Sequence, residues 1–109
     1  MPVTFKPLAR GQLTATDATL YTTPASTTTR LTEIAITNTD TVERTVTIRI
    51  VPSGGASGVD DDILSALPIA SKQTIVLDLK TVLATGDFIT GAASVTTVVN
   101  VRISGAEIT

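Results

Sequence analysis

The chain has 109 residues, a formal net charge of −2, 42% apolar residues and only 3% aromatic residues. This length predicts one domain with a modest core. The eight basic residues are scattered singly, which disfavours a nucleic-acid-binding surface, and the absence of cysteine excludes disulfides and thiolate metal sites. No apolar stretch approaches the roughly 20 residues needed to cross a bilayer, and the N-terminus lacks the apolar core of a secretory signal, so we expect a soluble protein.

Residues 1–10 are the first candidate element, which we interpret as an extended N-terminal arm. Pro2 and Pro7 remove backbone donors and favour extended chain, so the segment suits an arm or an edge strand. A frayed terminus is the alternative. Large apolar side chains in the segment favour docking on a neighbouring subunit. They are Val3, Phe5 and Leu8.

Residues 30–52 carry the strongest secondary-structure signal. Apolar and polar residues alternate in two arms, and a period of two is typical of strands with one buried face. Between the arms lie residues 38–41, whose short polar side chains favour a turn. We therefore predict an antiparallel β-hairpin. Its apolar set contains Ile34, Ile36, Val46, Ile48 and Ile50, with Arg44 as the one charge.

The remaining elements are shorter. Alternation predicts strands at residues 19–23, 73–80 and 95–104, and a strand start at residues 88–89. Residues 63–70 suit either a strand or a helical turn, residues 81–86 suit one helical turn, and residues 91–93 suit a turn.

These elements amount to about seven or eight short strands with almost no helix, which is typical of β-sandwiches and related barrels. The predicted fold class is all-β. We expect a single antiparallel β-sandwich or jelly-roll-like domain over residues 11–109, preceded by the arm of residues 1–10.

Catalytic chemistry is poorly provided for. The chain contains neither His nor Cys, the commonest general base and the commonest soft nucleophile. Ser71 and Lys72 are a formal nucleophile–base pair, but neighbours on a strand point to opposite faces. We expect no enzymatic activity and no cofactor.

The acidic run Asp60, Asp61 and Asp62 is the best candidate for a metal site. Several carboxylate oxygens suit Ca²⁺. However, calcium loops with strong signatures place their ligands at alternate positions and end in Glu, which is missing here. A solvated acidic loop is therefore the preferred interpretation, with calcium binding as the alternative.

Two further sets of residues suit binding. Val76 and Val98 are apolar residues on otherwise polar faces, and they would form a small assembly patch if the fold brings them together. Gln12, Thr22 and Asn100 could bind sugar hydroxyls. The chain has only three aromatic residues to supply the stacking platform that sugars favour, which weakens this second interpretation.

Five stretches carry short motifs whose order along the chain is more informative than any one of them. They are GQLTATDATLYTTPASTTTRLTEIAITNTD, VTIRIVPSGG, LPIASKQTIVLDL, GDFITG and VNVRISGAEIT. In this order, from about Gly11 to Thr109, the chain resembles a family of small tailed-bacteriophage virion proteins. It departs from the family at Ser26, where Gly is commoner, and at Thr90-Gly91. The first departure suggests a different turn type, and the second bears on the length of the strand after Asp87.

The resemblance implies a β-sandwich module without catalytic residues that serves as capsid decoration (cement), as a spike or in a tail fibre. A short chain with a proline-bearing arm favours a decoration protein on the capsid surface. We expect a homotrimer that bridges subunits of the major capsid protein. The alternatives are a tail, fibre or baseplate component and a receptor-binding module for carbohydrate. Neither nucleic acid nor a membrane is an expected partner.

Overall fold

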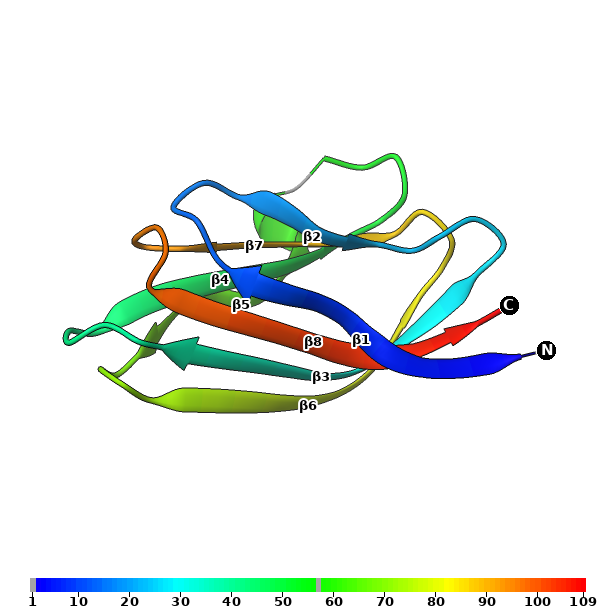
Figure 1. Cartoon of the computed structure of the whole chain (residues 1–109). Coiled ribbons are helices and arrows are strands. Elements are labelled where there is room, and N and C mark those ends of the chain that lie inside the picture. The colour runs from blue at the N-terminus through cyan, green and yellow to red at the C-terminus, as the bar shows by residue number, and fades with distance from the viewer. Residues whose placement is uncertain (1, 57) are drawn as a thin grey trace.

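The computed structural model describes residues 2–56 and 58–109, which form an all-β domain (Figure 1). Its strands are β1 Val3–Gln12, β2 Ala18–Thr22, β3 Thr28–Asn38, β4 Arg44–Val51, β5 Asp62–Ile69, β6 Thr74–Leu83, β7 Phe88–Ala93 and β8 Val99–Ile108, with a 3-10 helix at Val59–Asp61. The predicted fold class is confirmed. In the part of the chain described, no helix is long and apolar enough to span a bilayer.

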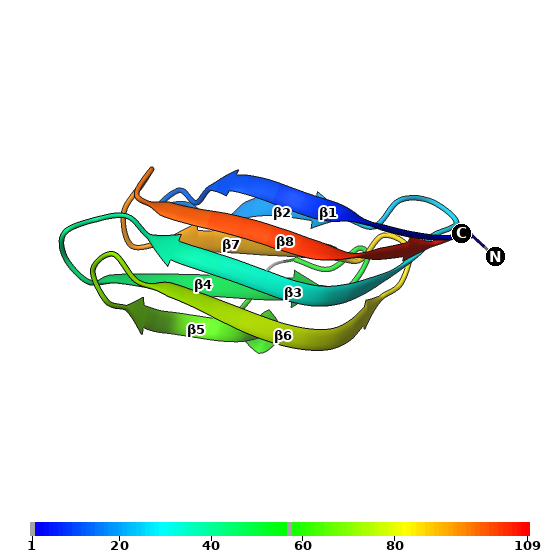
Figure 2. The ribbon, with the colours of Figure 1, turned by 60° about the horizontal axis from the view of Figure 1, so that its bottom comes forward.

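The strands form two antiparallel four-stranded sheets packed face to face (Figures 1 and 2). Sheet A has the strand order β1-β8-β3-β6, and sheet B has the order β2-β7-β4-β5. Strand β1 pairs with β8, β2 with β7, β3 with β6, and β4 with β5, as in one long hairpin rolled up on itself. Eight strands arranged in this way form a jelly roll.

Residues 30–52 form the two predicted strands, but the predicted hairpin between them is wrong. Strand β3 pairs with β6 and β8 in sheet A, whereas β4 pairs with β5 and β7 in sheet B. Ile34, Ile36, Val46 and Ile48 are buried as expected, at 0–1% exposure, but Ile50 is only partly buried and Val42, which the alternation also placed in the apolar set, is 49% exposed. Two strands with one apolar face each can be neighbours in one sheet, or they can lie in opposite sheets with their apolar faces stacked against each other. Alternation alone does not distinguish the two arrangements.

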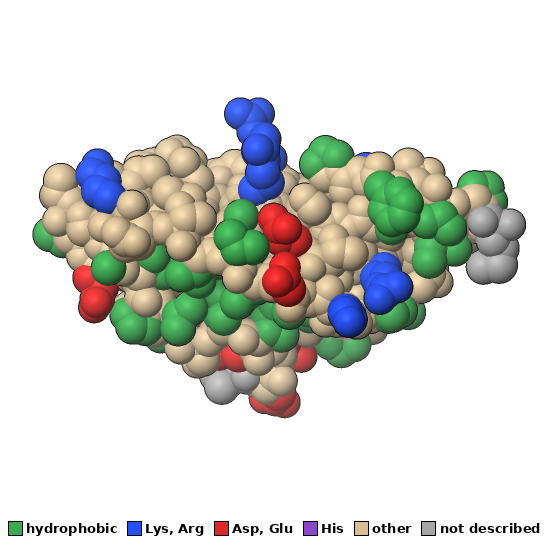
Figure 3. All heavy atoms as spheres, turned by 90° about the horizontal axis from the view of Figure 1, so that it is seen from below, with side chains coloured by type: hydrophobic (Ala, Val, Ile, Leu, Met, Phe, Trp, Pro, Cys, Tyr) green, Lys and Arg blue, Asp and Glu red, His purple; other side chains and the backbone are tan. Residues whose placement is uncertain are grey.

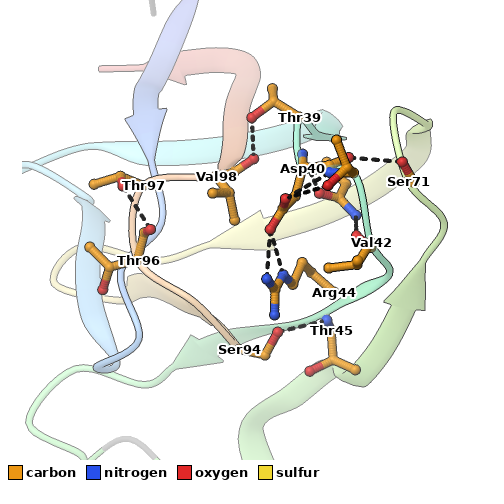
Figure 4. Close-up of polar contacts among 12 residues, drawn as sticks. Thr39, Asp40, Val42, Arg44, Thr45, Ser71, Ser94, Thr96, Thr97 and Val98 are labelled. Carbon is orange, nitrogen blue, oxygen red and sulfur yellow. Dashed lines mark hydrogen bonds and ion pairs between the residues drawn. The ribbon is translucent and has the colours of Figure 1, made fainter.

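The chain crosses from β3 to β4 in an arch held by polar side chains. The Nδ2 group of the fully buried Asn38 donates to the carbonyl oxygens of Val42 (3.0 Å) and Ile69 (2.9 Å), and its Oδ1 accepts from the backbone N–H of Asp40 (2.9 Å). Asp40 pairs with Arg44 at 2.7 Å (Figure 4). The hydrogen bond from Arg44 holds the pKa of Asp40 below its usual value. Arg44, the one charged residue in the apolar set predicted from the sequence, therefore pairs with Asp40 within the arch.

The core fills the space between the sheets. Its buried members are Leu13, Leu31, Ile34, Ile36, Val46, Ile48, Ile69, Leu83, Ile89, Ala93, Val99, Val101 and Ile103. The alternation predicted for β6 is confirmed, but its inward residues Ile75, Leu77 and Leu79 are only partly buried. Strand β6 lies at the edge of sheet A, so it has a neighbouring strand on one side only.

The N-terminal segment predicted as an arm takes the edge-strand alternative. Strand β1 pairs with β8 along its length, from Val3 opposite Ile108 to Gln12 opposite Asn100. The boundary expected after residue 10 therefore lies inside a strand, and Met1 lies outside the described residues. Because β1 supplies a quarter of sheet A, it is part of the sandwich.

Two short predictions in the second half of the chain are wrong. Residues 81–86 form the end of β6 and a tight turn, and residues 91–93 belong to β7. Gly91 lies in this strand because core side chains approach it closely. A Cβ atom there would come within 2.9 Å of Leu20 Cδ1. Glycine here marks close packing within a strand, a role that glycine in strands often has.

The last strand is shifted from its predicted range of 95–104 to Val99–Ile108. It continues through Gly105, which the sequence suggested as its end. A side chain at Gly105 would collide with the backbone carbonyl oxygen of Arg30 on β3. This glycine therefore permits the close approach of two central strands of sheet A.

Candidate assembly surface on sheet A

The outer face of sheet A brings together apolar candidates from strands that are distant in the sequence. Paired residues of neighbouring strands lie on the same side of a sheet, so the registers define rows across it. One row consists of Phe5, Ala106, Arg30 and Val82. Seen from this side, apolar, acidic and basic side chains are interspersed among polar ones (Figure 3).

Exposed apolar side chains lie where β1 begins, and we call Val3 and Phe5 the β1 patch. Their exposed fractions are 52% and 81%. Val82 of β6 is 63% exposed at the opposite edge of the sheet, and Ala106 and Arg30 lie between it and Phe5 in the row. With strands about 4.8 Å apart, the row places Phe5 and Val82 roughly 14 Å apart. Val82 was not singled out from the sequence, because only the register places it in the row of Phe5.

Leu8, the third apolar residue expected in a docking arm, is oriented differently. The pairing of β1 with β8 shifts between Pro7 and Ala9, so Leu8 occupies an irregularity in the strand. Its side chain is partly buried and packs against the core. A bulge of this kind re-aims the residue that it contains. Leu8 therefore anchors β1 to the sandwich and does not belong to the β1 patch.

Val76 and Val98 are not brought together. Val76 is 54% exposed on the outer face of sheet A, opposite Ala35. Val98, labelled in Figure 4 beside Thr39, precedes β8; it is partly buried and packs against the core. Its carbonyl oxygen accepts hydrogen bonds from the backbone and the side chain of Thr39. Of these two residues, only Val76 is available for contacts on the outer face of sheet A.

The end of β1 that carries the patch is fixed by a polar network beneath it. The Tyr21 hydroxyl from sheet B donates to Glu107 Oε2 at 2.5 Å and shares a hydrogen bond with Thr29 at 2.8 Å. Lys6 of β1 pairs with Glu107 at 3.0 Å. Burial and the bond to Glu107 raise the pKa of Tyr21 to about 12, and the bonds from Tyr21 and Lys6 lower the pKa of Glu107. The network ties β1 to both sheets.

The basic residues on the outer face of sheet A lack ion pairs within the described chain. Among the described residues, Lys6, Arg44 and Arg49 form ion pairs, and these lie away from this face. The basic residues of the outer face are Arg10, Arg30, Lys80 and Arg102. Glu33 and Asp78 are the acidic residues of the face, and they lie directly opposite each other.

The side chains of the acidic run Asp60 to Asp62 do not converge on one point, because Asp61 and Asp62 have different hydrogen-bond partners. Asp62 Oδ1 accepts from Arg49 Nε at 2.6 Å, and Asp61 Oδ2 accepts from the backbone N–H of Gly58 at 3.2 Å. The hydrogen bond from Arg49 lowers the pKa of Asp62. No group of three potential metal-binding side chains occurs within residues 2–56 and 58–109. Asp60 is exposed.

Ser71 and Lys72 lie in the turn between β5 and β6. The hydroxyl of Ser71 donates to the carbonyl oxygen of Asp40 at 2.9 Å, and Lys72 Nζ donates to that of Thr39 at 2.6 Å. Both side chains therefore hold the arch between β3 and β4 rather than each other.

Of the residues that could bind sugar hydroxyls, the structure brings together two. Gln12 and Asn100 are opposite each other on β1 and β8, and Gln12 Nε2 donates to Asn100 Oδ1 at 3.2 Å. Thr22 lies on β2 of sheet B. The pairing of the first strand with the last could not be read from the sequence.

Comparisons with known proteins add little to this picture. No protein-family model and no curated protein matches the chain. A chain in the structure of infectious bursal disease virus, Gx strain, aligns with a TM-score of 0.43 and 12% sequence identity. The alignment covers 97% of this chain and 30% of the viral chain. A similarity of this extent does not bear on function, so membership of the bacteriophage family stays a prediction.

Proposed function

We propose that this protein is a non-enzymatic structural component of a virion, placed on the capsid surface as a decoration protein. The strand order of its two sheets carries the proposal. Jelly rolls of eight strands are a recurring architecture of viral capsid domains and of lectins. This support is analogy at the level of the fold, because folds host many functions. The ordered sequence motifs shared with small phage virion proteins support the same role.

The β1 patch supplies the contact that such a role needs. Phe5 is 81% exposed, and burying a phenylalanine side chain contributes roughly 1.5–3 kcal/mol. In a homotrimer or on a symmetric shell the same contact recurs in every copy, so modest contacts add through avidity. The patch lies on an edge strand, where a neighbouring capsid subunit can reach it. The protein would then bridge shell subunits.

The experiment compares two matched surface variants of the full chain. Phe5→Ser removes the larger side chain of the β1 patch, whereas Val42→Ser removes an apolar side chain that is 49% exposed in the arch. Each is mixed with capsids of the encoding virus that lack the protein, and co-sedimentation and sedimentation velocity are measured. We expect Phe5→Ser to bind at least about tenfold more weakly, which corresponds to 1.4 kcal/mol, and Val42→Ser to behave as wild type.

Equal binding by wild type and Phe5→Ser would contradict the assembly role of the patch. Failure of the wild-type protein itself to bind capsids would contradict the decoration role. Circular dichroism of both variants controls for folding, since neither exposed side chain supports the core.

A further inference from the structure

A shallow hollow of about 530 Å³ lies on the outer face of sheet A, near the opposite end of β1 from the β1 patch. Strands β1, β8 and β3 form its floor and walls. Ala35 and Thr37 contribute short side chains from β3. The longer residues around them are Arg10, Gln12, Asn100 and Arg102. A volume of this size is within the range of small-molecule sites.

Two arginines on neighbouring strands line this hollow. Arg10 on β1 and Arg102 on β8 are direct cross-strand partners, and both are exposed. Neither has an ion pair with any described residue, and like charges directly opposite each other are destabilising. A bound anion would remove this repulsion. Guanidinium groups bind carboxylates through two parallel hydrogen bonds, so the pair suits a carboxylate.

The next row of the hollow carries neutral polar groups. Gln12 Nε2 donates to Asn100 Oδ1, and this bond leaves the Gln12 carbonyl oxygen and an Asn100 amide N–H without a partner in the described chain. Thr37 lies beside them, and its hydroxyl shares a hydrogen bond with that of Thr74 at 2.8 Å. A sugar hydroxyl both donates and accepts, so an acceptor and a donor side by side match neighbouring hydroxyls of one ring.

We propose that this hollow binds an acidic saccharide, with the carboxylate between Arg10 and Arg102 and the ring hydroxyls on Gln12 and Asn100. The combination of ion-pairing and hydroxyl-binding groups favours a sugar acid over an acidic peptide, whose apolar side chains would find no large apolar partner here. Nucleic acid is disfavoured because the chain is acidic overall. The inference does not depend on the proposed position in a virion.

The test is an NMR titration of the full-length ¹⁵N-labelled protein with four saccharide probes and a tetraglutamate peptide. Sialyllactose is compared with its methyl ester, and trigalacturonate with its methyl ester, so the members of each pair differ only in whether their carboxyl groups are charged. We expect at least one acidic saccharide to saturate the protein with shifts at Gln12 and Asn100, and its uncharged match to bind at least about tenfold more weakly.

Matched variants distinguish binding in the hollow from nonspecific electrostatic attraction of an anion to the outer face. Arg102→Gln removes one guanidinium of the hollow, and Arg30→Gln makes the same charge change on the same face outside it. We expect at least about tenfold weaker binding for Arg102→Gln and no change for Arg30→Gln. The proposal is overturned if neither acidic saccharide saturates, if both variants weaken binding equally, or if a tetraglutamate peptide binds more tightly than either sugar.

Discussion

Replacing Asn38 by alanine should destabilise the domain strongly, because its buried side chain makes several of the hydrogen bonds that hold the arch between the sheets. It is 0% exposed and makes three hydrogen bonds of 2.9–3.0 Å, to the carbonyls of Val42 and Ile69 and from the amide of Asp40. Each such bond contributes about 0.5–1.5 kcal/mol net. The loss of all three should therefore cost about 2–4 kcal/mol, a large part of the 5–15 kcal/mol typical of a domain.

Urea unfolding followed by circular dichroism measures this loss. With a slope of about 2 kcal/mol/M, the midpoint should fall by roughly 1–2 M. Asn38→Asp keeps the shape but replaces a donor with a carboxylate that faces two carbonyl oxygens, so it should cost at least as much at pH 7. Thr41→Ala is the control, since its hydroxyl has only a 3.5 Å contact with Asp40. A midpoint for Asn38→Ala within experimental error of wild type would refute the role of Asn38.

Three further outcomes are expected. Tyr21 is the chain's one tyrosine, so ultraviolet titration should show a single phenol with a pKa near 12. The stabilisation from its hydrogen bond to Glu107 should be complete below about pH 10, the ordinary phenol pKa, and should be lost as the pH rises through 12. A titration midpoint near pH 10 would contradict the network. Asp78→Lys should raise the melting temperature by about 2–4 °C, because it replaces repulsion with attraction opposite Glu33; no rise would contradict the register. Gly105→Ala should cost at least about 1–3 kcal/mol in urea unfolding, because the added methyl group meets backbone, and a neutral effect would show that β3 and β8 can separate.

Much of the secondary structure could be predicted from the sequence, because alternation is a local property. Ile34, Ile36, Val46 and Ile48 are buried as expected. Strand pairing could not be predicted, because alternation fixes which face a strand buries and says nothing of its neighbour. Glycine was also misleading. Gly91 was assigned to a turn and the last strand was ended before Gly105, whereas both glycines permit close packing inside strands.

The turn chemistry of Ser26 shows the same limit. In the family that the sequence resembles, glycine is commoner at this position, which suggested a different turn type. Ser26 has a φ of 55°, in the left-handed region that glycine adopts readily. The serine therefore adopts a conformation that favours glycine.

The candidate sites depend on register and were only partly foreseen. The exposure of Phe5 follows from its place on an extended N-terminal segment, so it could be proposed from the sequence. Val82 and the pair Arg10 and Arg102 could not be proposed from the sequence, because their positions relative to residues on other strands depend on the strand pairing. Leu8 was misinterpreted because a local irregularity turns it toward the core.

Copy number in purified virions tests the proposed structural role most directly. Quantitative mass spectrometry of particles from the encoding virus measures the ratio of this protein to the main shell protein. A decoration protein that bridges shell subunits should be present in a fixed ratio to them, in many copies per particle. Absence of the protein from washed virions, or its presence in only a few copies, would contradict the role on the capsid surface.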